Sequence, residues 1–148
     1  MFVLDLEGSI VINWPVEEVF SYMDDIEKEH EWQPYLKEWK QSPDPHKNGV
    51  GTIRRYANRY MGRSFTNVYQ VLEYEPNVKV MYKSTPEAAV QAEGGTLWEP
   101  VNGGTKVTFI FKPELGDFWG YIPKPIVRRI YMGTLDSNMR RLKQVIES

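Results

Sequence analysis

Two polar residues, Thr134 and Asn138, lie where a C-terminal amphipathic helix should be apolar. From Ile126 to Glu147 the apolar residues recur at helical spacing, and a count at about 100° per residue places both polar side chains inside the stripe that contains Val127 and Leu142. Polar groups on a buried face need hydrogen-bond partners, which are backbone groups, each other or a ligand. We favour the third option. The pattern therefore predicts a cavity beside this helix in which a hydroxyl and an amide orient a bound molecule.

The strand-like segments carry further candidates for the wall of this cavity. Alternation over residues 65–71 places Asn67 and Tyr69 on the same side as apolar neighbours, so an amide and a phenol face inward. Such groups orient a ligand that apolar and aromatic walls hold by burial. The predicted wall also includes Tyr56, Tyr82, Phe109, Phe111 and Tyr131.

Further aromatic residues are candidates for the mouth of the cavity or for a lid over it. These are Trp32, Tyr35, Trp98 and Trp119. Aromatic side chains with a polar edge suit an amphipathic opening, and the alternative is that they pack against helix ends.

Arginines cluster around one expected hairpin, at Arg54, Arg55, Arg59 and Arg63, with Tyr56 among them. Alternation sends Arg55 and Arg59 to the side opposite Tyr56, so most of the guanidinium groups should be solvated. Because the net charge is -2 at pH 7, the chain has no overall positive field, and we expect no nucleic-acid partner. One arginine that enters the cavity and holds a ligand carboxylate remains an open alternative.

Residues for acid–base or metal chemistry are sparse. His30 and His46 stand in charged or proline-rich segments without a second histidine at ligand spacing, so we expect no bound metal. We interpret His30 as a solvated loop residue, with a general base at the cavity entrance as the alternative. We interpret Asp24 as a helix-terminating residue and Asp25 as a solvated one, rather than as an acid–base pair. No glycine pattern matches a phosphate or dinucleotide loop, and we expect no cofactor.

Length and composition favour one intracellular domain. The 148 residues suffice for one ordinary domain, which we expect to span residues 1–148. The chain has no cysteine, which excludes thiol catalysis and disulfides and fits a cytoplasmic location. Asp5 and Glu7 interrupt the first apolar residues and no apolar run reaches membrane-spanning length, so we expect neither a signal peptide nor integral membrane association.

The elements that position these residues begin with a strand and a short helix. Residues 2–12 alternate as an edge strand, with Gly8 at the place where a bulge or bend would form most easily. Pro15 then opens a short helix that ends near Asp24, and residues 25–30 form a further helical turn.

Antiparallel hairpins follow from about residue 39 to residue 112, where alternating segments are separated by glycine and proline. One face of the resulting sheet is apolar and the other is wet. The helix of residues 126–147 comes last, so it is the element available to cover the apolar face.

Several short segments have a recognisable order and spacing. They are Ile10–Ile12 leading into Pro15–Phe20 and Asp24, Trp32, Gly49–Gly51, Val71 with Glu75–Pro76, Gly104–Thr108, and Leu142–Lys143. Together with the order of the elements, they resemble the START-like (SRPBCC) superfamily and, within it, the polyketide cyclase/dehydrase-like group, over the whole chain. The resemblance implies an α+β helix-grip fold, in which a curved antiparallel sheet of about seven strands wraps around a long C-terminal helix, with two short helices after the first strand.

The resemblance also implies an internal cavity for a lipid, polyketide, hormone or similar hydrophobic molecule. Our leading hypothesis is a non-catalytic protein that binds a small hydrophobic or amphipathic ligand there. The enzyme alternative is a cyclase or dehydratase that moves protons with Tyr69, Tyr131 or His30. A third alternative is a chaperone-like module that binds a protein partner through the exposed sheet or through Phe118 and Trp119.

Overall fold

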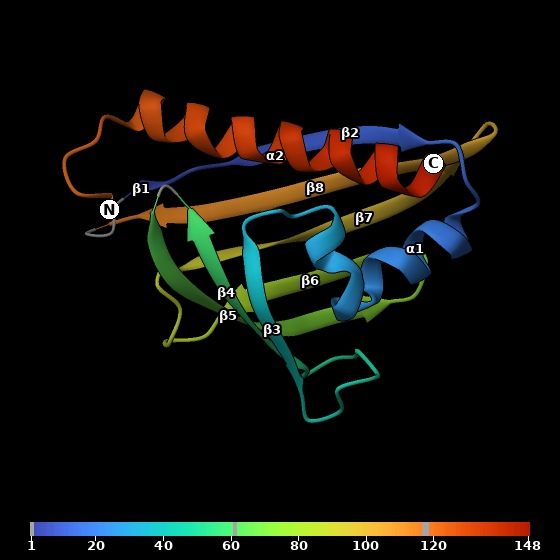
Figure 1. Cartoon of the computed structure of the whole chain (residues 1–148), viewed down its shortest axis with the longest axis horizontal. Helices are drawn as coiled ribbons and strands as arrows, with labels where there is room; N and C mark the ends of the chain where they lie inside the picture. Colours follow the sequence, from blue (N-terminus) through green and yellow to red (C-terminus); the bar gives the residue numbers. More distant parts are fainter. Residues whose placement is uncertain (1, 61, 117–118) are drawn as a thin grey trace.

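The computed structural model describes residues 2–60, 62–116 and 119–148. The order of helices and strands along the chain largely follows the prediction from the hydrophobic pattern (Figure 1). The elements are β1 (Phe2–Val3), β2 (Leu6–Ile12), α1 (Val16–Asp24), η1 (Ile26–Glu31), β3 (Leu36–Ser42), β4 (Ile53–Tyr60), β5 (Arg63–Glu75), β6 (Lys79–Ser84), β7 (Ala92–Val101), β8 (Gly104–Leu115) and α2 (Lys124–Glu147).

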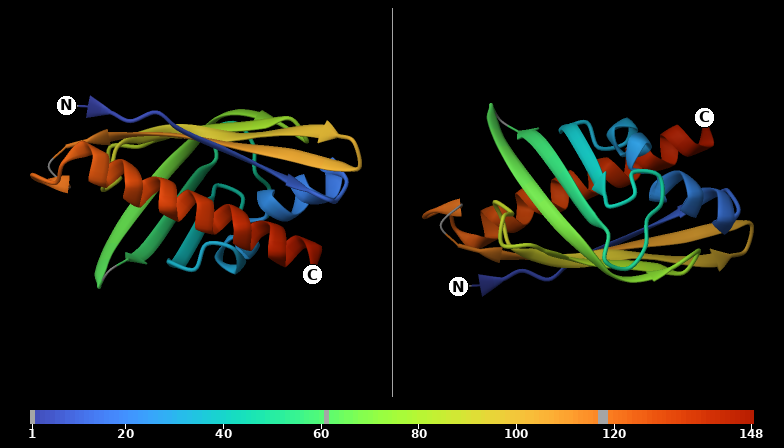
Figure 2. Two further views of the ribbon diagram at one scale, coloured as in Figure 1. Left: turned by 90° about the horizontal axis from the view of Figure 1, so that it is seen from above. Right: turned by 90° about the horizontal axis from the view of Figure 1, so that it is seen from below.

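The strands form an antiparallel sheet in which β3 to β8 follow one another as hairpins. At the far edge β1 and β2 lie one after the other along β8, with Val3 opposite Glu114 and Leu6 opposite Phe111. Figure 2 shows that the sheet curves around α2, with α1 and η1 at the end near the C-terminus. This arrangement confirms the predicted helix-grip fold, including the two short helices after the first strand.

Helix α1 closes one end of the sheet through its apolar face. Pro15 precedes the first turn, where Glu17 and Glu18 complement the helix dipole. Val19, Phe20 and Met23 are buried, as the spacing predicts, and they join Trp98 and Leu142 in one core cluster. The expected further helical turn is η1, a 3₁₀ helix. Asp25 caps its N-terminus, because the Asp25 side chain accepts a hydrogen bond of 3.0 Å from the backbone N–H of Glu27.

The hydrophobic core is divided between the two ends of the sheet. The cluster around α1 lies at one end, and a second cluster of Leu4, Leu6 and Val127, with Phe111 and Trp119 packed against it, lies at the other. Residues of both clusters line the space between them. The sheet and α2 therefore enclose a cavity rather than a continuous core.

The bulge that was one expectation for Gly8 does not form. The register runs without a bulge from Glu7–Ile110 through Gly8–Phe109, and pairing is interrupted instead between β1 and β2. A Cβ atom at Gly8 would lie 2.9 Å from Met139 Cε, so the glycine allows α2 to approach the strand closely. Irregular pairing occurs elsewhere, between Leu36 and Glu38 and between Val71 and Glu73.

Helix α2 presents different faces to the sheet and to solvent. Val127 and Leu142 are fully buried, whereas Arg129, Asp136 and Arg140 are exposed, in agreement with the predicted helix phase. No helix in the described ranges is long and apolar enough to cross a membrane.

Candidate ligand cavity

A cavity of about 940 Å³ lies between the sheet and α2. Its wall is built from β2, the α1–η1 region, β3 to β8, the segment before α2, and α2 itself. Small-molecule sites in proteins typically measure about 300–1,000 Å³ and combine apolar walls with a few placed polar groups. The size and composition of this cavity meet that description.

All of the side chains predicted from the sequence line this cavity. They are Trp32, Tyr35, Tyr56, Asn67, Tyr69, Tyr82, Trp98, Phe109, Phe111, Trp119, Tyr131, Thr134 and Asn138. Their contact with a ligand stays a prediction, because the structure gives only their positions on the wall.

Two of the tryptophans expected at the mouth lie elsewhere. Trp32 and Trp98 are both buried in the core cluster around α1, where Trp98 Nε1 contacts Met23 Sδ at 3.4 Å. They form the inner wall because Trp98 lies within β7 and Trp32 directly follows η1, where both pack against the apolar face of α1. The exposed members of the lining, Tyr35 and Ile122 among them, mark the rim instead.

The helical wall combines an aromatic end with a polar middle. Tyr131 packs against Phe111, with ring centroids 5.6 Å apart, and its hydroxyl accepts a hydrogen bond of 3.0 Å from Trp119 Nε1. Burial raises the pKa of Tyr131 to about 12, although the bond from Trp119 acts in the opposite direction. Thr134 and Asn138 follow at helical spacing on the same wall.

Tyrosines from three adjacent strands form the opposite wall. The ring centroids of Tyr56 and Tyr69 are 6.1 Å apart, and those of Tyr69 and Tyr82 are 4.7 Å apart. Burial raises the pKa of each of these tyrosines well above its ordinary value. Their hydroxyls stay neutral near pH 7, where they act as hydrogen-bond donors and acceptors rather than as general bases.

Three of the lining residues have a buried polar atom without a hydrogen-bond partner among the described residues. These atoms are Trp32 Nε1, Asn67 Oδ1 and Asn138 Oδ1. An unpaired buried polar group costs about 1–3 kcal/mol of folding free energy. All three residues line one cavity, where water or a bound molecule would be the source of the missing partners.

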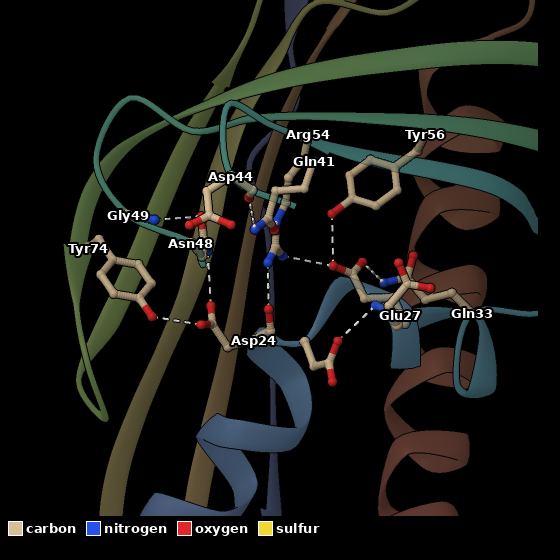
Figure 3. Close-up of polar contacts among 12 residues, drawn as sticks. Asp24, Glu27, Gln33, Gln41, Asp44, Asn48, Gly49, Arg54, Tyr56 and Tyr74 are labelled. Carbon is tan, nitrogen blue, oxygen red and sulfur yellow. Dashed lines mark hydrogen bonds and ion pairs between the residues drawn. The ribbon is translucent and has the colours of Figure 1, made fainter. Parts of the chain in front are cut away.

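The sequence did not reveal a buried ion pair at the α1 end of the cavity. Arg54 and Glu29 line the wall with only 9% and 7% of their surfaces exposed, and Arg54 Nη1 lies 3.0 Å from Glu29 Oε1. Arg54 Nε also donates to Gln41 Oε1 at 2.8 Å, and its Nη2 donates to the carbonyl oxygen of Asp24. Figure 3 shows Arg54 between Gln41 and the end of α1 at Asp24.

The two carboxylates of this end accept several hydrogen bonds each. Glu29 accepts from Tyr56 at 2.8 Å and from Gln33 at 3.2 Å. Asp24 accepts from Tyr74 at 2.6 Å and from Asn48 at 2.9 Å (Figure 3). Burial raises the pKa of Glu29, while the Arg54 charge opposes this shift.

The strand and helix patterns of the sequence predict part of this hydrogen-bond network. Arg54 shares the strand face of Tyr56, so alternation allowed an inward arginine and correctly sent Arg55 outward. In a 3₁₀ helix residues three apart lie on one face, which aligns Glu29 with the buried Ile26 and Trp32. Asp24 does end α1, but its carboxylate belongs to the network rather than only closing the helix.

The histidines lie away from the cavity. His30 is exposed and stacks on Trp39, with ring centroids 4.6 Å apart, and it is not a lining residue. The alternative of His30 as a general base at the entrance therefore has no geometric support. Within the ranges that the structure describes, no group of three or more His, Cys, Asp or Glu side chains is placed to hold a metal ion.

Comparison with known families identifies the class to which this cavity belongs. A family model described as "Polyketide cyclase / dehydrase and lipid transport" matches residues 4–147. The chain belongs to this family, as the sequence resemblance predicts. No curated protein sequence gives a significant match.

Solved structures share the fold at low sequence identity. The protein TTHA0849 of Thermus thermophilus is 19% identical over 95% of both chains, with a TM-score of 0.80. A START superfamily protein of Mycobacterium smegmatis is 16% identical over 97% of both chains, with a TM-score of 0.79. The ZhuI aromatase/cyclase of Streptomyces sp. R1128 is 12% identical, with 99% of this chain and 94% of that chain covered and a TM-score of 0.77. At these identities the likeness establishes the fold alone.

Proposed function

We propose that this protein binds a small hydrophobic or amphipathic molecule, such as a lipid or a polyketide, in the cavity between the sheet and α2. The observation that supports this most is the gathering of Trp32 Nε1, Asn67 Oδ1 and Asn138 Oδ1 on the wall of a cavity of about 940 Å³. Apolar and aromatic walls supply affinity by burial, and the polar groups orient the ligand.

Native mass spectrometry of gently purified protein tests this function. We expect a stoichiometric small-molecule adduct on the wild-type chain, either carried through purification or formed with added amphiphiles. Asn138→Phe should weaken it strongly because the new ring projects into the cavity and replaces the amide, whereas Asp136→Phe should not because Asp136 is exposed on the same helix. An equal yield of adduct in wild type and Asn138→Phe, or no binding of any amphiphile, contradicts the proposal.

A cyclase or dehydratase is the second candidate, favoured by the tyrosines of the cavity wall. Because burial raises their pKa, Tyr69 and Tyr131 would act as neutral hydrogen-bond donors to a reacting carbonyl and not as bases. Unchanged turnover of a polyketide-like substrate by Tyr69→Phe and Tyr131→Phe would reject these roles.

A protein partner has weaker support from the surface around the start of α2. Tyr121 is fully exposed, and Ile122 and Ile126 are each nearly half exposed. Trp119, by contrast, donates its indole N–H to the hydroxyl of Tyr131, and Phe118 lies outside the described residues. A single-domain organisation and a cytoplasmic location remain predictions from the sequence.

A further inference from the structure

The charges on the cavity wall are few and unevenly placed. Among the described lining residues, Asp24, Glu29, Arg54 and Arg63 carry charge. Arg63 is exposed at the start of β5, so the inner wall combines one guanidinium with two carboxyl groups. An arginine would ordinarily make this end a site for a carboxylate ligand.

The contacts of Arg54 argue against that role. Its Nε, Nη1 and Nη2 each donate to a protein acceptor, namely Gln41, Glu29 and the Asp24 carbonyl. A ligand carboxylate that approached Arg54 would either displace Glu29 or stay beside it, which leaves one buried anion without its cation. Removing the partner of a buried charge is strongly unfavourable, so the pair shields the cavity from anions.

The carboxylates are equally engaged. Glu29 accepts from Arg54, Tyr56 and Gln33, and Asp24 accepts from Tyr74 and Asn48. Both carboxylates at this end thus have hydrogen-bond partners within the protein, and the one guanidinium of the inner wall already has an anionic partner, so none of these groups favours a ligand carboxylate.

Neutral groups make up the remaining polar surface. Asn67 and Asn138 each have an oxygen without a partner, which a hydroxyl or N–H of a ligand would satisfy. Trp32 Nε1 lacks an acceptor, which a carbonyl or hydroxyl oxygen would supply. These groups are neutral, and a ligand that carries both donors and acceptors would match them.

We infer that the cavity selects neutral amphipathic ligands that carry hydroxyl or carbonyl groups, and discriminates against carboxylates of the same skeleton. This selectivity rests on the proposed ligand-binding function and specifies its ligand class. The Arg54–Glu29 pair sets the selectivity by holding the guanidinium away from the ligand.

Two fluorescent probes with the same aromatic skeleton and chain length test the inference. At pH 7.5, 1-pyrenebutanol is neutral and 1-pyrenebutyrate is anionic, and binding of each is followed by fluorescence anisotropy. We expect the wild-type protein to bind the alcohol at least about tenfold more tightly, a ratio equal to about 1.4 kcal/mol. In Glu29→Gln the guanidinium loses its anionic partner, so butyrate affinity should rise about tenfold while butanol affinity changes by less than about threefold.

Glu87→Gln is the matched control. Glu87 is an exposed carboxylate paired with Arg55 on the outer face of the sheet, so this variant removes the same charge without touching the cavity. It should leave the ratio of the two affinities unchanged.

The outcomes separate the two proposals. If neither probe binds the wild-type protein, the proposed function fails and the inference fails with it. If butyrate binds as tightly as butanol or more tightly, ligand binding stands and the inference is wrong. Equal gains of butyrate in Glu29→Gln and Glu87→Gln would also overturn it, because the effect would then come from overall charge. The affinities of the wild-type protein for the two probes test the inference even if Glu29→Gln does not fold.

Discussion

At the scale of single residues, Arg54 and Arg55 show how neighbouring arginines on one strand take opposite roles. Arg54 is buried against Glu29, Gln41 and the end of α1, whereas Arg55 is half exposed and pairs with Glu87 on the outer face. The buried arginine therefore ties β4 to the α1–η1 corner. The exposed one makes a surface pair of the kind that contributes little to stability.

The two arginines should differ sharply in their contribution to folding. Arg54→Met leaves Glu29 buried without a cation, so we expect the free energy of unfolding to fall by about 3–5 kcal/mol. Arg55→Met should change it by less than about 1 kcal/mol because the surface pair is screened by solvent. Urea denaturation followed by tryptophan fluorescence measures both. Equal losses in the two variants would contradict the assigned roles.

Asn138 should favour binding at the cost of stability. Its Oδ1 has no partner among the described residues, so Asn138→Leu removes an unsatisfied buried group from the ligand-free protein. We expect the unfolding free energy to stay level or rise by about 1 kcal/mol, while affinity for a neutral amphiphile falls about tenfold or more. A variant that is less stable yet binds as tightly as wild type would show that the amide serves folding alone.

At the scale of elements, the contact between β2 and α2 decides how tightly the helix closes the cavity. Gly8 lies opposite Met139 and Leu135, and Lys143 Nζ donates to the Val11 carbonyl at 2.7 Å along the same edge. These contacts hold the C-terminal half of α2 against β2, and Val127 packs against Leu4 and Leu6 nearer its N-terminus.

Two glycine-to-alanine substitutions, one at this contact and one on the exposed side of α2, should have opposite effects on stability. Gly8→Ala places a Cβ 2.9 Å from Met139 Cε and 3.2 Å from Leu135 Cδ2, so the ends of these side chains must repack and the unfolding free energy should fall by about 1 kcal/mol. Gly133→Ala meets nothing within 4 Å on the exposed side of α2, and higher helix propensity should raise the unfolding free energy by about 0.5–1 kcal/mol. Thermal and urea denaturation compare the two. A stabilising Gly8→Ala would contradict the close approach.

Element order and helix phase could be predicted well from the sequence because both depend on local periodicity. The phase of α2 placed Thr134 and Asn138 on the cavity wall, and strand alternation placed Tyr69 there. Gly8 was misread because glycine tolerates a bulge and a close approach equally well, and only the packing of α2 distinguishes the two.

The buried network could not be predicted because its partners are distant in sequence. Glu29 stands in a charged segment, and its contacts with Arg54 and Tyr56 span 25 and 27 residues. Neither a strand pattern nor a helical pattern specifies such a pairing. Strand alternation was enough to predict that Arg54 points inward. Its ion pair with Glu29 could be seen only in the folded structure.

At the scale of the whole molecule, buried tyrosines should make the fold sensitive to alkali. Burial raises the pKa of Tyr56, Tyr69 and Tyr82 above the unfolded value of about 10. Above that pH the unfolded chain releases protons that the folded chain retains, so this contribution to stability is full below about pH 9 and is lost as the pH rises through 10 and beyond.

Urea denaturation between pH 8 and pH 11 measures this loss. Tyr69→Phe should reduce the slope of stability against pH in the alkaline range, because it removes one of the retained protons. Tyr121→Phe is the control, since Tyr121 is fully exposed. Identical slopes for wild type and Tyr69→Phe would contradict burial of that hydroxyl.

The most direct measurement is an NMR titration of the wild-type protein with 1-pyrenebutanol, read at the tryptophan indole N–H resonances. Trp32 Nε1 lies on the cavity wall without a partner among the described residues, whereas Trp39 Nε1 donates to Glu27 at 2.9 Å and Trp39 is not a lining residue. A ligand in the cavity should shift the Trp32 resonance to saturation at one equivalent and leave that of Trp39 in place. A Trp32 resonance that does not move, at concentrations where the probe is bound, would contradict an internal site between the sheet and α2.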